Sequence, residues 1–206
     1  MSLQKINFDL IKHRRVIGIN NAYGDPVLDE KGETTKDEKS RLIYTPRDWV
    51  DACWFGDGRW YDLHKHNLLS FKGIIAHCVD RINVHGLVCY RRGKPQGIVT
   101  SSDAVSWNRS SGTSAINFAF HLGVKTVVLL GFDMKRINDR PNWHQDHPGS
   151  HRKNVEDPYE RFLRCFSHVA SDAQTLGLEI INCTPDSAIT QFPIMPLEEY
   201  LRKEVI

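Results

Sequence analysis

Polar residues follow four apolar segments of this chain, at the point where each segment ends. The groups are Asn20-Asn21, Gly56-Asp57, Gly131-Phe132-Asp133 and Thr184-Pro185-Asp186-Ser187. Polar residues are common in any turn, and an asparagine there either caps the next segment or binds a ligand through its amide. If the preceding segments are parallel strands, their carboxyl ends converge at one sheet edge, where open α/β sheets bind ligands. The four groups are therefore candidates for one shared cleft.

A second candidate site lies at the start of an expected helix, where Arg109 precedes the small-residue turn Ser110-Ser111-Gly112. Apolar residues recur at helical spacing after this turn, and Gly123 is a suitable residue to end the helix. Free N–H groups and the helix dipole at such a start favour a phosphate. The alternative is an ordinary helix–strand unit that binds no ligand.

The segment His144-Gln145-Asp146-His147-Pro148-Gly149-Ser150-His151 has three interpretations. One histidine can act as a general base, because its pKa lies near neutrality. The three histidines, with Asp146, can instead bind a transition metal. Their spacing matches no strong zinc signature, and Pro148-Gly149 would break a helix that aligned them. The third interpretation is a solvated loop without a special role.

The elements that must position these residues follow from periodicity. Short apolar runs predict buried strands at 16–20, 51–55, 73–78, 126–130 and 178–182, with an edge strand within 84–90. Helical spacing predicts helices within 59–71, from 110 to 123, from Asp157 as cap to Gly177, and from Pro196 onward. Residues 24–40 and 134–157 are expected to be long loops. This order predicts an α/β protein with a Rossmann-like, mostly parallel sheet flanked by helices, in a single domain over 1–206.

Composition excludes several classes of protein. The chain has 206 residues and a net charge of +2, so no nucleic-acid partner is expected. No apolar run is long enough to span a bilayer, and the start of the sequence lacks the apolar core of a signal peptide. The five cysteines form no C-x-x-C pair, which is typical of reduced cysteines in a cytoplasmic protein. The sequence also lacks a Walker A motif, a G-x-G-x-x-G motif and a G-x-S-x-G elbow.

The motifs VIGINNAY, WFGD, SSGTSAINFAFHLGVKTVVLLGFD, HPGSHRK and INCTPDS occur in this order. The set resembles the bacterial lipooligosaccharide sialyltransferases, which use CMP-sialic acid. It is similar to the related superfamily of 6-hydroxymethylpterin diphosphokinase-like proteins and motility accessory factors that modify flagellin, and especially to phage- or prophage-borne members of unassigned activity. The resemblance spans nearly the whole chain, although only the SG…LG…LLGFD core is specific.

The resemblance implies a role for several residues. Asn20 matches an asparagine that contacts the nucleotide, and Arg109, Ser111 and Gly112 match residues beside the sugar donor. His151 matches the general base that deprotonates the acceptor hydroxyl, in a direct displacement that needs no metal. Together with the strand-end residues Asn21, Asp57 and Asp133, these are the expected nucleotide- or donor-binding positions.

Two departures from the family bear on this expectation. The family's glycine-rich first strand and turn have no counterpart, because Ser2-Leu3 stands where that motif should finish. Two phosphate-binding tyrosines are also replaced by Met134-Lys135-Arg136, so that Lys135, Arg136 or Arg140 would have to contact the phosphate instead.

The resulting expectation is a glycosyltransferase-like enzyme, a transferase that takes a CMP-type nucleotide sugar and an unknown acceptor. It needs no cofactor and is cytoplasmic, and the resemblance implies a homo-oligomer. One alternative is a pterin diphosphokinase-like enzyme that uses ATP and Mg²⁺, with Asp57 and Asp133 as ligands. The other alternative is a non-catalytic phage accessory or binding module.

Overall fold

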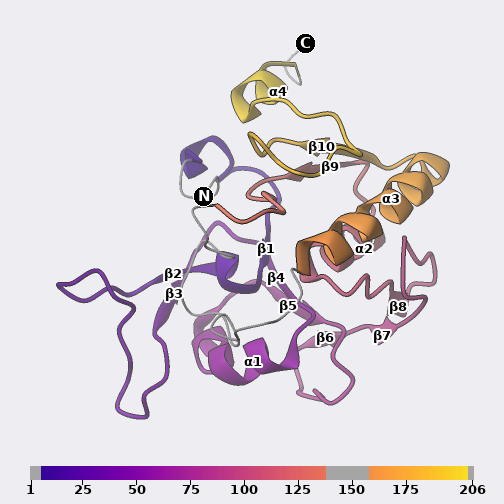
Figure 1. Cartoon of the computed structure of the whole chain (residues 1–206). Coiled ribbons are helices and arrows are strands. Elements are labelled where there is room, and N and C mark those ends of the chain that lie inside the picture. The colour runs from indigo at the N-terminus through magenta and orange to yellow at the C-terminus, as the bar shows by residue number, and fades with distance from the viewer. Residues whose placement is uncertain (1–5, 138–157, 204–206) are drawn as a thin grey trace. The chain divides into compact units, whose positions relative to one another are not determined.

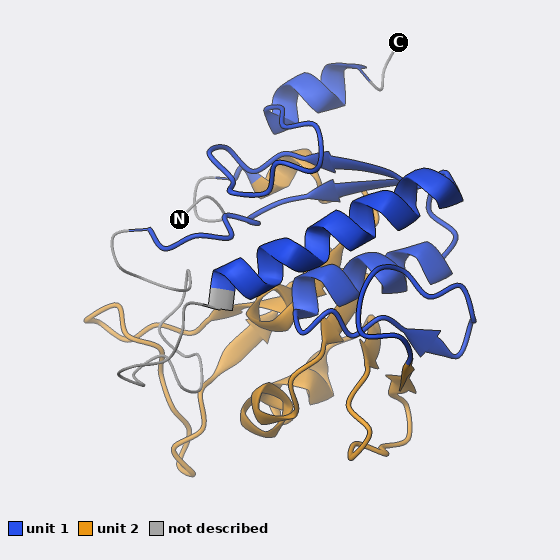
Figure 2. Cartoon of the chain, turned by 45° about the vertical axis from the view of Figure 1, so that its right-hand side comes forward, with its two compact units in different colours: residues 1–7, 93–206 blue, residues 8–92 orange. Residues whose placement is uncertain are grey.

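The computed structural model describes residues 6–137 and 158–203, and the chain divides into two compact units (Figures 1 and 2). Unit 1 comprises residues 1–7 and 93–206, and unit 2 comprises residues 8–92. Each unit has a parallel sheet of its own, and the single domain over 1–206 stays a prediction. Within the described ranges, no helix is both long and apolar enough to cross a membrane.

Unit 2 is built on a four-stranded parallel sheet with the strand order β1-β4-β5-β6. Its strands are β1 (Ile17–Ile19), β4 (Ala52–Phe55), β5 (Ile74–His77) and β6 (Val88–Cys89). All four residues of β4 are buried, as expected for a central parallel strand with a continuous apolar sequence. The strands predicted at 16–20, 51–55 and 73–78 are confirmed, and the one within 84–90 is reduced to the two residues of β6.

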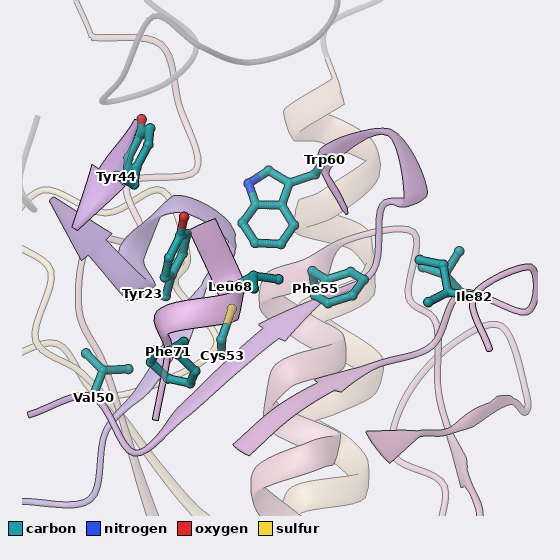
Figure 3. Packing of buried hydrophobic residues seen from close by; sticks show 10 residues of the cluster. Tyr23, Tyr44, Val50, Cys53, Phe55, Trp60, Leu68, Phe71 and Ile82 are labelled. Atoms are coloured by element: carbon teal, nitrogen blue, oxygen red, sulfur yellow. The ribbon is translucent and has the colours of Figure 1, made fainter. Parts of the chain in front are cut away.

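Short helices and an aromatic cluster cover this sheet (Figure 3). The helices are η2 (Phe8–Leu10), η3 (Asn20–Tyr23), α1 (Gly58–His64) and η4 (Asn67–Ser70). Trp60 of α1 stacks on His64 with ring centroids 4.7 Å apart and meets Tyr23 edge-on at 5.8 Å. Both Trp60 and Tyr23 are buried, and burying a large apolar side chain stabilises a fold by about 1.5–3 kcal/mol.

The expected loop over 24–40 is largely exposed, but its backbone is hydrogen-bonded. It begins in β2 (Gly24–Pro26), which pairs antiparallel with β3 (Tyr44–Pro46), and the chain between these two strands forms an arm (Figure 1). The arm contains the same turn twice. In each turn an aspartate, Asp29 or Asp37, accepts hydrogen bonds through Oδ1 from the amides two and four residues later, at 2.9 Å. The sequences D-E-K-G-E and D-E-K-S-R are thus an internal repeat that the sequence analysis missed.

The two turns differ at the position that needs a left-handed backbone. This position is Gly32 in the first turn, with φ of 75°, and Ser40 in the second, with φ of 58°. Because only glycine adopts this region without a steric cost, Ser40→Gly should raise the free energy of unfolding of unit 2 by about 0.5–1 kcal/mol in urea titrations. Lys39→Gly, one position earlier and outside the left-handed region, should lower it. A Ser40→Gly variant less stable than the parent would contradict the conclusion that the left-handed backbone at Ser40 lowers the stability of unit 2.

Unit 1 pairs β9 (Thr126–Leu129) with β10 (Glu179–Asn182) in parallel, and α2 (Ser111–His121) lies beside α3 (Pro158–Leu176) in Figures 1 and 2. On α3, Phe166 meets Phe132 edge-on at 6.3 Å and Phe192 at 6.1 Å. Gly123 and Gly177 follow α2 and α3 with φ of 78° and 67°, which confirms both predicted helix ends. The predicted cap Asp157 lies outside the described residues. The unit also holds α4 (Leu197–Lys203).

Strands are present at all five predicted positions, so the α/β class is confirmed. They are not all buried, since Leu129 is the one buried residue of β9. Their hydrogen bonds in the described chain form a four-stranded and a two-stranded parallel sheet, and the Rossmann-like arrangement stays a prediction. The chain leaves unit 2 through the short strand β7 (Arg91–Arg92), and β8 (Ala104–Val105) follows in unit 1. Sequence periodicity shows that a segment is a buried strand, but it does not show which strand lies beside it.

Candidate functional site

The carboxyl ends of β9 and β10 meet in unit 1 and form the best-defined candidate site. The Phe132 amide donates to Thr184 Oγ1 at 2.9 Å, and Ser187 Oγ donates to the Phe132 carbonyl at 2.6 Å. The Ala188 amide donates to the Asp133 carbonyl at 2.9 Å. Two of the four strand-end groups, at 131–133 and 184–187, therefore share one edge, as the sequence predicts.

The first turn of α2 packs against the same edge. A Cβ atom on Gly112 would lie 2.8 Å from Phe132 Cε1, so a larger residue would push the helix start away from the strand end. Ser111 and Gly112 are both half-buried, and Asp133 is half-buried as well. The structure thus brings together Ser111, Gly112 and Asp133, three of the predicted binding residues.

The start of α2 lacks two features that commonly offset a helix dipole. Ser110 is the N-cap residue, and its side chain makes no capping hydrogen bond within the described chain. The first turn also contains no acidic residue. Because Ser110 does not cap the helix with its side chain and the first turn itself has no carboxylate, the amides of this turn are suited to bind an anion.

Arg109 directly precedes this helix start and is exposed, with its guanidinium 5.9 Å from the centre of the Trp107 ring. Asn108 and Arg109 both have φ of 51°, a left-handed conformation that is unfavourable for residues other than glycine. Residues held in such conformations occur preferentially at functional sites. They place a cationic side chain next to the uncapped amides of α2.

Buried side chains hold the loop that presents Arg109. The Asn108 side chain accepts from the Gly97 amide at 2.9 Å and donates to the Gly97 carbonyl at 3.0 Å. Asn117 of α2 accepts at 2.8 Å from the amides of both Val99 and Ser106, and it donates to the Val99 carbonyl at 2.9 Å. Both asparagines are fully buried.

Asp172 of α3 fastens the same loop from a second helix. Its carboxylate accepts from Lys94 Nζ at 2.6 Å and from the Ile98 amide at 2.7 Å. The hydrogen bond from Lys94, followed by that from Ile98, lowers the pKa of Asp172 below its ordinary value. The sequence analysis missed Asn108, Asn117 and Asp172. An asparagine within the apolar run of α2 was the available signal, because buried polar groups are nearly always hydrogen-bonded.

The remaining predicted residues with described positions lie in unit 2. Asn21 is only 1% exposed, and its amide is engaged within the core: it donates to Tyr44 Oη and accepts from Trp60 Nε1, both at 2.7 Å. Asp57 caps α1 by accepting from the Arg59 amide at 2.8 Å. Asn20 has φ of 52°, and its buried Oδ1 has no hydrogen-bond partner among the described residues.

The predicted positions therefore divide between the units, and one cleft shared by all four strand-end groups stays a prediction. Asn20, Asn21 and Asp57 belong to unit 2, whereas the residues around the start of α2 belong to unit 1. His151 lies outside the described residues, together with His144, His147 and Arg140. In the described ranges, no three His, Cys, Asp or Glu side chains are grouped so that they could hold a metal ion.

The chain matches no protein-family model, no curated protein sequence and no solved structure. The resemblance to sialyltransferases therefore remains an expectation from the sequence motifs.

Proposed function

We propose that unit 1 binds the phosphate of a nucleotide at the first turn of α2, and that the chain is a nucleotide-sugar-binding, glycosyltransferase-like enzyme. One observation carries this proposal: the uncapped start of α2 packs on the carboxyl end of β9, beside the exposed Arg109. Carboxyl strand ends and helix starts are where α/β proteins bind nucleotide phosphates.

In this proposal the amides of Ser111 and Gly112 donate to the phosphate, and Arg109 offsets its negative charge. Both groups would stabilise the charge that builds up on the nucleotide as it leaves. His151, by its resemblance to the family's base, would take the proton of the acceptor hydroxyl. The acceptor oxygen forms a bond to the anomeric carbon as the bond from that carbon to the phosphate oxygen breaks. Arg109 and the helix dipole supply positive charge without a metal ion.

The test is a thermal-shift screen of the full chain against CMP, CMP-sialic acid, UDP-sugars, GDP-sugars and ATP, each with and without Mg²⁺. A ligand at 100 times its dissociation constant adds about 2.7 kcal/mol of stability, enough for a shift of a few degrees. We expect a shift with CMP compounds that does not require Mg²⁺. Arg109→Ala should weaken CMP binding about tenfold, as expected for a lost charge-assisted hydrogen bond. Arg202→Ala, an exposed arginine of α4, is the matched control.

His151→Ala separates catalysis from binding. It should abolish transfer to an acceptor while leaving CMP affinity nearly unchanged, because a general base contacts the acceptor rather than the nucleotide. A shift with ATP that requires Mg²⁺ would replace the proposal with the diphosphokinase-like alternative. The absence of a shift with every nucleotide would contradict nucleotide binding and would favour the non-catalytic binding module.

A further inference from the structure

Unit 2 contains a cleft of about 670 Å³ at the amino ends of its parallel strands. The segments that line it directly precede β1, β4 and β5, so it lies at the sheet edge away from Asn20 and Asp57. Its volume is typical of a site for a small molecule. Neither the resemblance nor the proposed function uses this cleft.

Basic side chains predominate in the lining. The five lysines and arginines are Lys12, Arg14, Arg15, Arg47 and Lys72, joined by His13 and by only two carboxylates, Asp48 and Asp51. Asp51 is already engaged, because its Oδ1 accepts from Arg15 Nη1 at 2.9 Å and its Oδ2 from the Val16 amide at 2.8 Å. The cleft therefore favours an anionic ligand.

Arg47 and two aromatic rings pack together beside the cleft. Arg47 donates to both carboxylate oxygens of Asp25, and its side chain is only 9% exposed. Its guanidinium lies 4.5 Å from the centre of the Phe8 ring and 5.4 Å from that of Trp49, and these two rings are 5.2 Å apart. Arg47 thus positions the wall, and the packing of Trp49 against Phe8 and Arg47 makes it a poor platform for stacking nucleic-acid bases.

The floor is equally well defined. A Cβ atom on Gly73 would lie 2.2 Å from the Asp51 carbonyl oxygen, and the Ile74 amide donates to that oxygen at 2.9 Å. The starts of β4 and β5 are therefore in direct backbone contact below the cleft.

Two cations are available to a ligand. The side chain of Arg15 is 91% exposed, and its pair with Asp51 is open to water. Lys72 is exposed and forms no ion pair with another described residue. Exposed ion pairs add little to stability, so a phosphate can compete for Arg15 at small cost. A guanidinium matches the geometry of phosphate oxygens, and lysine supplies a second point charge.

We propose that this cleft binds a small phosphorylated molecule, with its phosphate held between Arg15 and Lys72. The packing of Arg47 with Trp49 and the backbone contact at Gly73 would reduce the ordering cost of binding. The small volume and the packed Trp49 favour such a ligand over a nucleic-acid strand.

The test is calorimetric titration of the full chain at low salt with inorganic pyrophosphate and with inorganic phosphate. Pyrophosphate should bind more tightly than phosphate, because it carries more charge. Arg15→Gln and Lys72→Gln should each weaken pyrophosphate binding about tenfold, as expected for one lost charge-assisted hydrogen bond. Lys39→Gln, an exposed lysine in the arm of unit 2, is the matched control and should have no effect. Because Lys72 forms no described ion pair, its variant should remain folded.

Arg109→Gln keeps this test separate from the proposed nucleotide site in unit 1. Arg109→Gln should not change pyrophosphate binding at the cleft. The NMR signals of the Gly73 amide and the Trp49 indole report this binding, because both residues line the cleft. The proposal is overturned if pyrophosphate does not shift these signals, or if the two cleft variants bind it as the parent does. It is also overturned if a single-stranded oligonucleotide, but not pyrophosphate, binds through Arg15 and Lys72.

Discussion

Asn21→Ala is expected to lower the free energy of unfolding of unit 2 by about 3–4 kcal/mol. The Asn21 amide joins three parts of the core, because it donates to Tyr44 Oη and accepts from Trp60 Nε1. Its removal leaves the buried indole N–H of Trp60 without its described acceptor, takes one hydrogen bond away from the Tyr44 hydroxyl, and leaves a cavity. Each unpaired buried group costs about 1–3 kcal/mol.

Urea unfolding followed by tryptophan fluorescence measures this effect, and a double-mutant cycle with Trp60→Phe identifies its origin. Trp60→Phe removes the indole donor, so part of the cost of Asn21→Ala should disappear in the double variant. A cost below about 1 kcal/mol, or fully additive effects, would show that the bridge is not what stabilises this core. Asn21 would then again be a candidate for ligand binding rather than a core residue.

Asn117→Ala is expected to destabilise unit 1 by about 3–5 kcal/mol. This side chain forms three hydrogen bonds to the backbone of the loop before α2, two to Val99 and one to Ser106. It is fully buried, so water cannot replace these bonds without opening the loop. The loop leads to Arg109, and nucleotide binding should weaken together with stability.

Hydrogen exchange gives a local measurement for Asn117→Ala, because the amides of Val99 and Ser106 should lose protection. The matched control is Asn182→Ala, which removes an equally buried asparagine of the same unit. Asn182 accepts one described hydrogen bond, from the Thr184 amide at 3.1 Å, and its Nδ2 has no partner among the described residues. Its removal should cost about half as much. Equal costs, with unchanged exchange at Val99, would contradict the role assigned to Asn117.

Asn21 and Asn117 both show that the sequence does not distinguish a structural asparagine from one that binds a ligand. Asn20 and Asn21 are adjacent and of one type, yet only Asn21 has its amide engaged on both sides within the core. Asn117 stands in an apolar helix run and holds a loop. Which backbone or ring atoms face an amide is set by segments distant in sequence, so residue type and spacing cannot separate a binding asparagine from a structural one.

The sequence alone predicted the features that depend on interactions between neighbouring residues. The apolar runs predicted the positions of five strands, and the glycines at 123 and 177 predicted the helix ends, because these features depend on neighbouring residues. The strand ends at 131–133 and 184–187 were also predicted to lie together. Only the tertiary structure decided that the strands form two sheets in two units, and that cations before β1 and β5 line one cleft. These features depend on pairing and packing between distant segments, on which periodicity carries no information.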